Sequence, residues 1–244
     1  MKIGAIIQAR MGSTRLPGKV MLDLCGKYVI DHVIDRVKQS KYIDEIVIAS
    51  TTSKNDDKII ERAKENKIKY FRGSEEDVLS RYYYAALENK LDVIVRITSD
   101  CPLIDSFVTD EIIKFYIDNK YEIVSNEGPH PTEKTYPRGL DTEVFSFKSL
   151  KDAYVNAKEK YQREHVTPYI YENYTNIYYY KNGEDYSNYR WTLDTHEDWK
   201  LIKEIYINLY KGKHDFHFKD ILNLFDRKTE LMTINQHVNQ KKIK

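Results

Sequence analysis

Apolar positions in the first half of the chain follow two alternating spacings. The run "KIGAIIQA" over residues 2–9 is almost continuously apolar and ends at a turn-rich loop, which is typical of a buried parallel strand. Residues 28–40, "YVIDHVIDRVKQS", instead place valine and isoleucine at the spacing of a helix with one buried face. This alternation predicts an α/β protein with a mainly parallel sheet and helices on both faces.

The alternation continues to about residue 120 and then breaks. Further strands are predicted over 45–51, 69–73 and 91–100, and further helices over 55–67, 75–90 and 107–120. In the second half, short strands are predicted over 121–126, 142–147, 177–182 and 189–195. The stretch over 149–173 is predicted to be largely helical with an interruption at Pro168, and residues 196–210 are predicted to form an amphipathic helix. The segment from about Lys211 has the character of a polar tail. No repeat or linker divides the chain, so we expect one domain over residues 1–244.

Composition and charge narrow the class of protein. The 244 residues carry 39 Lys and Arg against 38 Asp and Glu, so an anion site has to be built locally, and neither nucleic acid nor a membrane is an expected partner. No segment approaches the ~20 apolar residues that span a bilayer, and the amino-terminal residues do not resemble a signal peptide. Two cysteines, Cys25 and Cys101, make no metal or disulfide framework. A cytoplasmic protein is expected.

The loop after the first predicted strand combines cations with turn-forming residues. In "ARMGSTRLPGK", residues 9–19, three cations (Arg10, Arg15 and Lys19) lie among small and turn-forming residues. Backbone amides and cations in such a loop suit a polyphosphate. The loop matches neither the Walker A pattern nor a Gly-x-Gly-x-x-Gly turn, and a solvated surface loop is the alternative interpretation.

Two aspartates follow predicted strands that lie far apart in the sequence. Asp100 ends the strand over 91–100, and Asp194 ends the segment "YRWTLD". Ligands of parallel α/β sheets bind outside the carboxyl ends of the strands, where these two carboxylates could share Mg²⁺. The alternatives are a local turn at Asp100 and a helix cap at Asp194 ahead of His196.

These residues resemble a known family. "QARMGSTRLPGKV" looks like the signature loop of the cytidylyltransferases that make CMP-activated sugars, close to CMP-Kdo synthetase. "GSEEDVLSRYYYAA", "VRITSDCPLID", "GLDTEVFSF", "REHVTPYI" and "LDTHEDWKLI" are similar to the spore coat polysaccharide biosynthesis branch, so the resemblance runs from residue 3 to about 205. It implies a Rossmann-like, three-layer nucleotide-diphospho-sugar transferase fold with a mostly parallel mixed sheet. It also implies Mg²⁺-dependent transfer of CMP from CTP to a small sugar-like acceptor, and a possible homodimer.

The resemblance also implies roles for individual residues. Catalysis would rest on Arg10, Lys19 and Asp100, and Mg²⁺ would be held by Asp100 and Asp194. The nucleotide would be surrounded by Gln8, Ala9, Arg10, Gly12, Ser13, Lys19, Thr51, Ser74, Asp77, Arg81 and Thr98. The acceptor would face Asp141, Glu143, Arg163, Glu164 and His165. His196 stands where the family often has proline, and a solvated first-turn histidine is the favoured interpretation there, whereas helix packing is the alternative role for His165.

Two other functions are compatible with the same sequence. One keeps the fold but uses another nucleoside triphosphate, or a polyol phosphate or sugar phosphate as acceptor. The other is a catalytically idle nucleotide-binding protein that acts through a partner. The loop over 129–137 is long enough to be an acceptor lid or a dimer arm.

Overall fold

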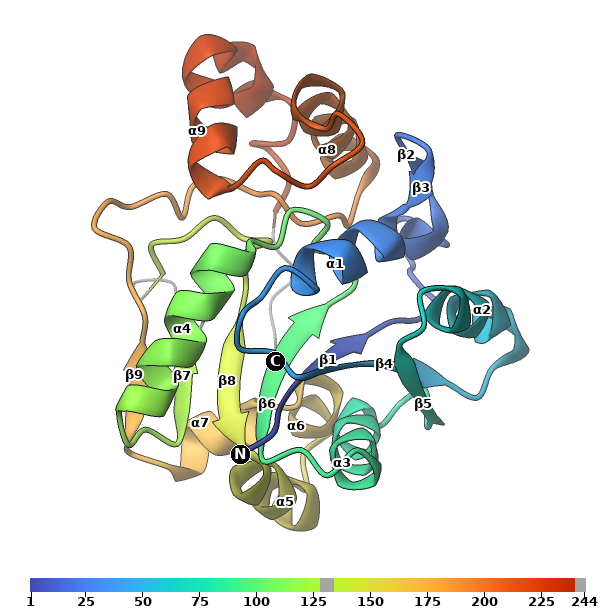
Figure 1. Ribbon diagram of the computed structural model, residues 1–244, viewed down its shortest axis with the longest axis vertical. Coiled ribbons are helices and arrows are strands. Elements are labelled where there is room, and N and C mark those ends of the chain that lie inside the picture. Colours follow the sequence, from blue (N-terminus) through green and yellow to red (C-terminus); the bar gives the residue numbers. More distant parts are fainter. Residues whose placement is uncertain (128–133, 240–244) are drawn as a thin grey trace.

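A computed structural model of the chain describes residues 1–127 and 134–239, in which a seven-stranded sheet forms the centre (Figure 1). The strand order is β5-β4-β1-β6-β8-β7-β9. The bounds of these strands are Lys69–Gly73 for β5, Glu45–Thr51 for β4, Ile3–Gln8 for β1, Val93–Thr98 for β6, Glu143–Ser146 for β8, Ile123–Ser125 for β7 and Ile177–Tyr179 for β9. A separate two-stranded hairpin joins β2 (Asp23–Leu24) to β3 (Lys27–Tyr28).

Strand direction brings several chain segments to one edge of the sheet. The pairs β1–β4, β1–β6 and β4–β5 are parallel, so their carboxyl ends meet. Strand β8 is antiparallel to both β6 and β7, and therefore begins at the edge where those strands end. The predicted fold class, a mostly parallel mixed sheet with helices, is confirmed.

Helices cover both faces of the sheet and enclose two apolar cores (Figure 1). One core lies under α1 (Val29–Val37), α2 (Asp57–Glu65), α4 (Ser106–Asp118), α8 (His196–Leu209) and α9 (Phe218–Arg227). The other lies under α3 (Val78–Glu88), α5 (Phe147–Asn156) and α7 (Pro168–Asn173), and α6 (Lys160–His165) packs beside α3 and α7. Among the described residues, 3₁₀ segments are formed by η1 (Lys19–Met21), η2 (Lys54–Asp56) and η4 (Thr229–Thr233). Because strand residues alternate between faces, β6 places Val93 and Val95 in the first core and Ile94 in the second.

The prediction of a strand over 189–195 is wrong. Only a single bridge between Arg190 and Arg138 forms there. The segment is nevertheless extended and bonded to loops, since the amide of Trp191 donates to the Arg138 carbonyl (2.7 Å) and the amide of Leu193 donates to the Asp100 carbonyl (2.8 Å). Its apolar residues are buried against the end of the sheet rather than within it.

The helical stretch predicted over 149–173 is divided into α5, α6 and α7. The first break follows Asn156, and the second lies at Val166, whose backbone has φ 74° and ψ −57°. There the amide of Thr167 donates to the carbonyl of His165 (2.9 Å), which closes a γ-turn at a positive φ that is strained for a β-branched residue.

The polar tail expected from Lys211 is a folded part of the molecule. Helix α9 and the 3₁₀ segment η4 lie in it, and α9 packs beside α8 (Figure 1). Phe218, Ile221, Leu224 and Phe225 place one face of α9 in the first core. The segment looked polar because only every third or fourth residue is apolar, which is the pattern of a surface helix.

Part of the loop over 129–137, for which a lid or a dimer arm was expected, lies outside the described residues. Within the ranges 1–127 and 134–239, no helix combines the length and apolar character needed to cross a membrane.

Candidate active site

Lys19 joins the two aspartates that the sequence singled out. Its Nζ lies 2.7 Å from Oδ2 of Asp100 and 2.7 Å from Oδ1 of Asp194. Asp100 follows β6, and the hydrogen bond from Leu193 to the Asp100 carbonyl brings Asp194 beside it. Asp100 and Asp194 therefore lie side by side, as expected for residues at the carboxyl ends of parallel strands, although the strand predicted over 189–195 does not form.

The charges in this triad reinforce one another. Burial by itself would raise the pKa of Asp100, but the charge of Lys19 and its hydrogen bond outweigh burial and lower that pKa to about 2. Burial would lower the pKa of Lys19, and the two carboxylates reverse this and raise it above its usual value. Both groups are therefore charged across the neutral range.

Asp194 does not cap α8, so the helix cap considered as an alternative role for it is wrong. The N-cap is Thr195, whose hydroxyl accepts from the amide of Asp198 in a capping box. The carboxylate of Asp194 is free to face three cations: Lys19, Arg15 (3.0 Å) and Arg190 (2.9 Å). His196, at the first position of α8, is exposed, as expected for a solvated residue.

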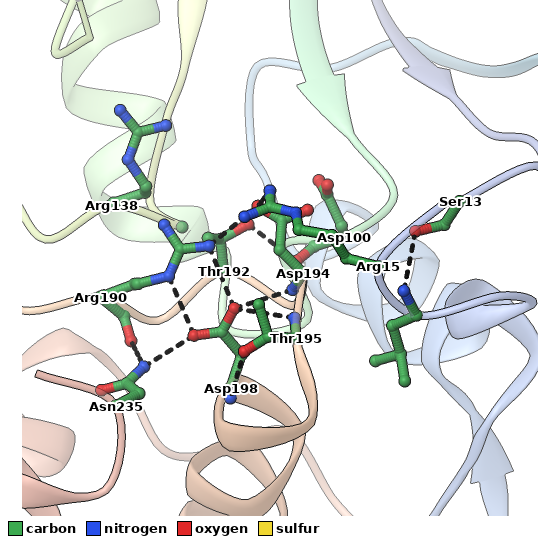
Figure 2. A network of polar contacts seen from close by, with 12 residues as sticks. Ser13, Arg15, Asp100, Arg138, Arg190, Thr192, Asp194, Thr195, Asp198 and Asn235 are labelled. Carbon is green, nitrogen blue, oxygen red and sulfur yellow. Dashed lines mark hydrogen bonds and ion pairs between the residues drawn. The ribbon is translucent and has the colours of Figure 1, made fainter. Parts of the chain in front are cut away.

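A second layer of contacts surrounds Asp194. Figure 2 shows the carboxylate of Asp198 among Arg190, Asn235 and the backbone of Asp194 and Thr195. Asp198 is fully buried, and its two oxygens accept from the guanidinium of Arg190 at 2.9 and 3.0 Å. Asn235 reaches this group from the carboxyl-terminal segment.

The loop between β1 and η1 is held in a compact shape by its own backbone and by the side chain of Asp56 in η2. The amide of Met11 donates to Oδ1 of the buried Asp56 (2.8 Å), and the amide of Gly18 donates to the Met11 carbonyl (3.2 Å). Gly18 has φ 67°, the left-handed conformation that glycine adopts without strain. Ser13 Oγ accepts from the amide of Leu16 (3.4 Å), and Arg10 reaches toward Glu75 (3.6 Å) and remains 44% exposed.

A second loop, over 74–77, lies beside the first. The buried Arg81 donates to the carbonyls of Ser74 and Glu75, and burial lowers the pKa of its guanidinium. Asp77 caps α3 through the amide of Ser80 (2.9 Å). A side chain at Gly12 would meet the carboxylate of Glu75 at 3.2 Å, so the two loops approach closely there.

Four further residues of the predicted nucleotide site lie at strand ends. Gln8 ends β1 and Ala9 follows it, Thr98 ends β6 and Thr51 ends β4. Oε1 of Gln8 is buried and accepts no hydrogen bond from the described residues. Gln8 and Thr98 are register partners, so the two side chains lie on the same face of the sheet.

Two carboxyl groups next to β8, those of Asp141 and Glu127, form a pair, and only Asp141 was predicted to belong to the site. Burial, together with the charge and hydrogen bond of Glu127, raises the pKa of Asp141 well above its usual range. Burial would raise the pKa of Glu127 as well, but the hydrogen bond from Asp141 and the charges of Arg138 and Lys134 lower it to about 2. Burial and the charge of its neighbour thus make Asp141 the carboxyl group of this pair that is harder to ionise.

The other expected acceptor residues lie in two elements, β8 and α6. Glu143 is buried at the start of β8, where it pairs with Arg96 of β6 and accepts from the hydroxyl of Tyr171 (2.8 Å). Arg163 of α6 is bonded to Asp77 at 2.7 and 2.9 Å, which links α6 to the start of α3. Glu164 and His165 are half-buried at the end of α6.

Several residues of the site were not predicted. Arg15 was recognised as a loop cation without a role, and Asp198 has a signal only in the Thr-x-x-Asp capping pattern over 195–198. Glu127 and Asn235 carry no local signal, because each acts through contacts with residues farther along the chain. Arg190 contacts Asp194 and Asp198 close by in the sequence, but a strand was predicted there, which gave its side chain no role.

The fold and the sheet-edge site together define an α/β protein with clustered cations and a carboxylate pair. The model of the cytidylyltransferase family matches residues 4–239, and the chain belongs to this family of nucleotidyltransferases. The chain is 40% identical to the uncharacterized protein MJ1063 of Methanocaldococcus jannaschii, over 99% of this chain and 97% of that protein. It is 33% identical to the spore coat polysaccharide biosynthesis protein SpsF of Bacillus subtilis, over 93% and 95%.

The solved structures agree with the family assignment. A cytidylyltransferase from Leptospira borgpetersenii superposes with a TM-score of 0.89 at 36% identity, covering 99% of this chain and 98% of that one. The resemblance to the spore coat branch and the nucleotide-sugar transferase fold that the sequence implied are therefore confirmed.

Proposed function

We propose that this protein transfers CMP from CTP to a sugar, sugar acid or related phosphorylated acceptor for surface glycan biosynthesis, with Mg²⁺ and release of pyrophosphate. The observation that carries the proposal is the Lys19 ammonium seated between Asp100 and Asp194 at the end of a cation-bearing loop. Membership of the cytidylyltransferase family and the similarity to SpsF support the donor and the pathway.

The carboxylate pair fits a hard divalent cation. The ammonium of Lys19 lies 2.7 Å from an oxygen of each carboxylate. Among the described residues, no cluster of three His, Cys, Asp or Glu side chains could form a complete protein cage. This suits Mg²⁺, which takes one or two carboxylates and completes its shell with phosphate oxygens and water. When bound, Mg²⁺ would neutralise charge on the triphosphate.

The proposed reaction requires no protein nucleophile. An acceptor oxygen attacks the α-phosphorus, the bond from that phosphorus to the bridging oxygen breaks, and pyrophosphate leaves with the electron pair. Where the attacking oxygen belongs to a hydroxyl group, its proton passes to solvent, whereas an ionised phosphate oxygen attacks without losing a proton. Arg10 and Lys19 would stabilise the charge that develops on the phosphates, and the loop over 9–19 would hold the triphosphate.

The remaining assignments are proposals of the same kind. The loop over 74–77, together with Arg81 and the strand-end residues around Gln8, would frame the nucleoside, and the unsatisfied Gln8 oxygen would accept from the cytosine amino group. Asp141 and Glu143 would face the acceptor, with Glu164 and His165 beyond them. A homodimer and a cytoplasmic location remain expectations from the resemblance and the composition.

Nucleotide selectivity tests the donor assignment without knowledge of the acceptor. Isothermal titration of the protein with CTP, UTP, ATP and GTP in Mg²⁺ is expected to give the tightest binding for CTP. Gln8→Leu should reduce the preference for CTP over UTP roughly tenfold, because one hydrogen bond to the base is lost. Equal affinity for all four triphosphates would contradict the proposed donor.

A further inference from the structure

Asn235 is a buried polar side chain in a segment where the sequence indicated no function. It follows η4, is 4% exposed, and lies far along the chain from the expected site residues. Its Nδ2 donates to the carbonyl of Arg190 (2.8 Å) and to Oδ1 of Asp198 (2.9 Å). One amide group thus uses both of its hydrogens on the two residues that surround Asp194 (Figure 2).

Asp198 transmits this contact to Asp194 through the backbone. Oδ2 of Asp198 accepts from the amides of Asp194 and Thr195, both at 3.0 Å. These two bonds fix the chain at the point where the Asp194 side chain leaves it. A shift of the Asp198 carboxylate would therefore move Asp194.

Arg190 provides the second connection. Its Nη2 donates to Oδ2 of Asp198 (3.0 Å) and to Oδ2 of Asp194 (2.9 Å), so the guanidinium bridges the two carboxylates. Its main-chain carbonyl is held by Asn235. The amide of Asn235 therefore restrains Arg190 at the backbone and, through Asp198, at the guanidinium.

We propose that Asn235, which lies in the carboxyl-terminal segment, is a positioning residue for cation binding by Asp194. The inference rests on the proposed function, since it takes Asp194 as a ligand of the divalent cation. Groups that orient a ligand from behind typically change metal affinity 10- to 100-fold when they are removed. A purely structural Asn235 would change stability and leave the affinity of the folded protein unaltered.

Mn²⁺ binding to the full-length protein separates these two roles. The free Mn²⁺ signal in electron paramagnetic resonance at 10 °C gives the dissociation constant without any acceptor and without CTP, which would itself chelate Mn²⁺. Asn235→Ala is expected to raise that constant roughly tenfold. Asn235→Asp, which keeps the shape and faces Asp198 with a second acid, should raise it at least as much. Asn235→Ser should give a smaller increase, and it serves if Asn235→Ala does not fold.

Two controls distinguish position from packing. Asn239→Ala changes an exposed asparagine of the same segment and should leave Mn²⁺ affinity unchanged. Leu231→Ala loosens the packing of η4 and should lower the melting temperature without changing Mn²⁺ affinity. Folded Asn235 variants that bind Mn²⁺ like the wild type would overturn the proposal. Wild-type protein that binds CTP but no Mn²⁺ would instead refute the metal assignment, and the proposal with it.

Discussion

The ammonium of Lys19 occupies the position between Asp100 and Asp194 where the proposed divalent cation would bind. Both cations favour the same two carboxylates, so they compete for them. Lys19 is only 12% exposed, and it reaches this position from the end of the loop proposed to hold the triphosphate. We therefore expect Lys19 to turn from the aspartates toward the phosphates when nucleotide and metal bind together.

Lys19→Met tests this exchange because two affinities should move in opposite directions. Without nucleotide, Mn²⁺ should bind several times more tightly, since the competing ammonium is gone. With Mg²⁺ present, CTP should bind roughly 10- to 100-fold more weakly, which is the effect of losing one charge-assisted hydrogen bond. Paramagnetic resonance and calorimetry give the two constants.

Lys27→Met is the matched control for this substitution. Lys27 of β3 pairs with Asp35 of α1 (2.7 Å), outside the site, and its substitution should affect neither constant. Weaker Mn²⁺ binding in Lys19→Met would show that the lysine supports the metal rather than competing with it.

At the scale of elements, two histidines connect α1 with the turn before α9. Nε2 of His32 donates to the carbonyl of Leu24 (2.6 Å), so Nδ1 of His32 accepts from Nε2 of His214 (2.7 Å). Burial lowers the pKa of His32 to about 4 and the pKa of His214 to about 3. Both rings are therefore neutral in the folded protein at neutral pH.

This pair predicts a specific loss of stability in acid. An unfolded histidine takes up a proton near pH 6.5, whereas the folded pair stays neutral to about pH 4, so the unfolded state binds more protons between these values. The free energy of unfolding is thus highest above pH 6.5 and falls as the pH drops toward 4.

Melting curves between pH 7.5 and 4.5 check the sign of this effect. The wild type should lose about 5 °C or more from the histidines, given that ~1 kcal/mol shifts a chain of this size by about 2–4 °C. His214→Gln should melt lower at pH 7.5 but show a shallower loss in acid. Parallel curves for the two proteins would contradict the assignment.

The elements show where prediction from sequence succeeded and where it failed. Strands β1, β4 and β6 were predicted because each is a buried run of apolar residues between clear turns. The segment over 189–195 has the composition of a strand, but its hydrogen bonds go to the loops at Arg138 and Asp100. Which partner an extended segment takes is a tertiary property, and no local pattern contains it.

At the scale of the whole molecule, the carboxyl-terminal segment completes the first core. The ring of Trp191, which is fully buried, lies 5.8 Å from the ring of Phe225 and 5.9 Å from the ring of Phe218. Trp191 precedes Asp194 by three residues, so this packing also supports the chain on which the proposed metal ligand lies.

Phe225→Ala is expected to lower the free energy of unfolding by about 3–5 kcal/mol, because it opens a cavity in the core. Urea denaturation followed by tryptophan fluorescence measures this change. Val155→Ala, at a position 67% exposed on α5, should change it by less than about 0.5 kcal/mol. Equal effects of the two substitutions would show that α9 does not belong to the cooperative core.

The sequence predicts those residues of the candidate site that follow the carboxyl ends of strands. Lys19, Asp100 and Asp194 were found because each follows a segment that runs to the same edge of the sheet. Glu127 was missed because its contact with Asp141 depends on β7 and β8 being antiparallel neighbours. Asn235 was missed because its role depends on how the carboxyl-terminal segment folds back onto α8.

Pyrophosphate release shows whether the protein transfers CMP from CTP. The protein is incubated with each of the four ribonucleoside triphosphates, Mg²⁺ and a panel of Kdo, nonulosonic acids, sugar phosphates and polyol phosphates, with Asp100→Ala as a folded control expected to be inactive. We expect release with CTP and at least one acceptor in the wild type alone. Release with another triphosphate but not with CTP, or full activity of Asp100→Ala, would contradict this expectation.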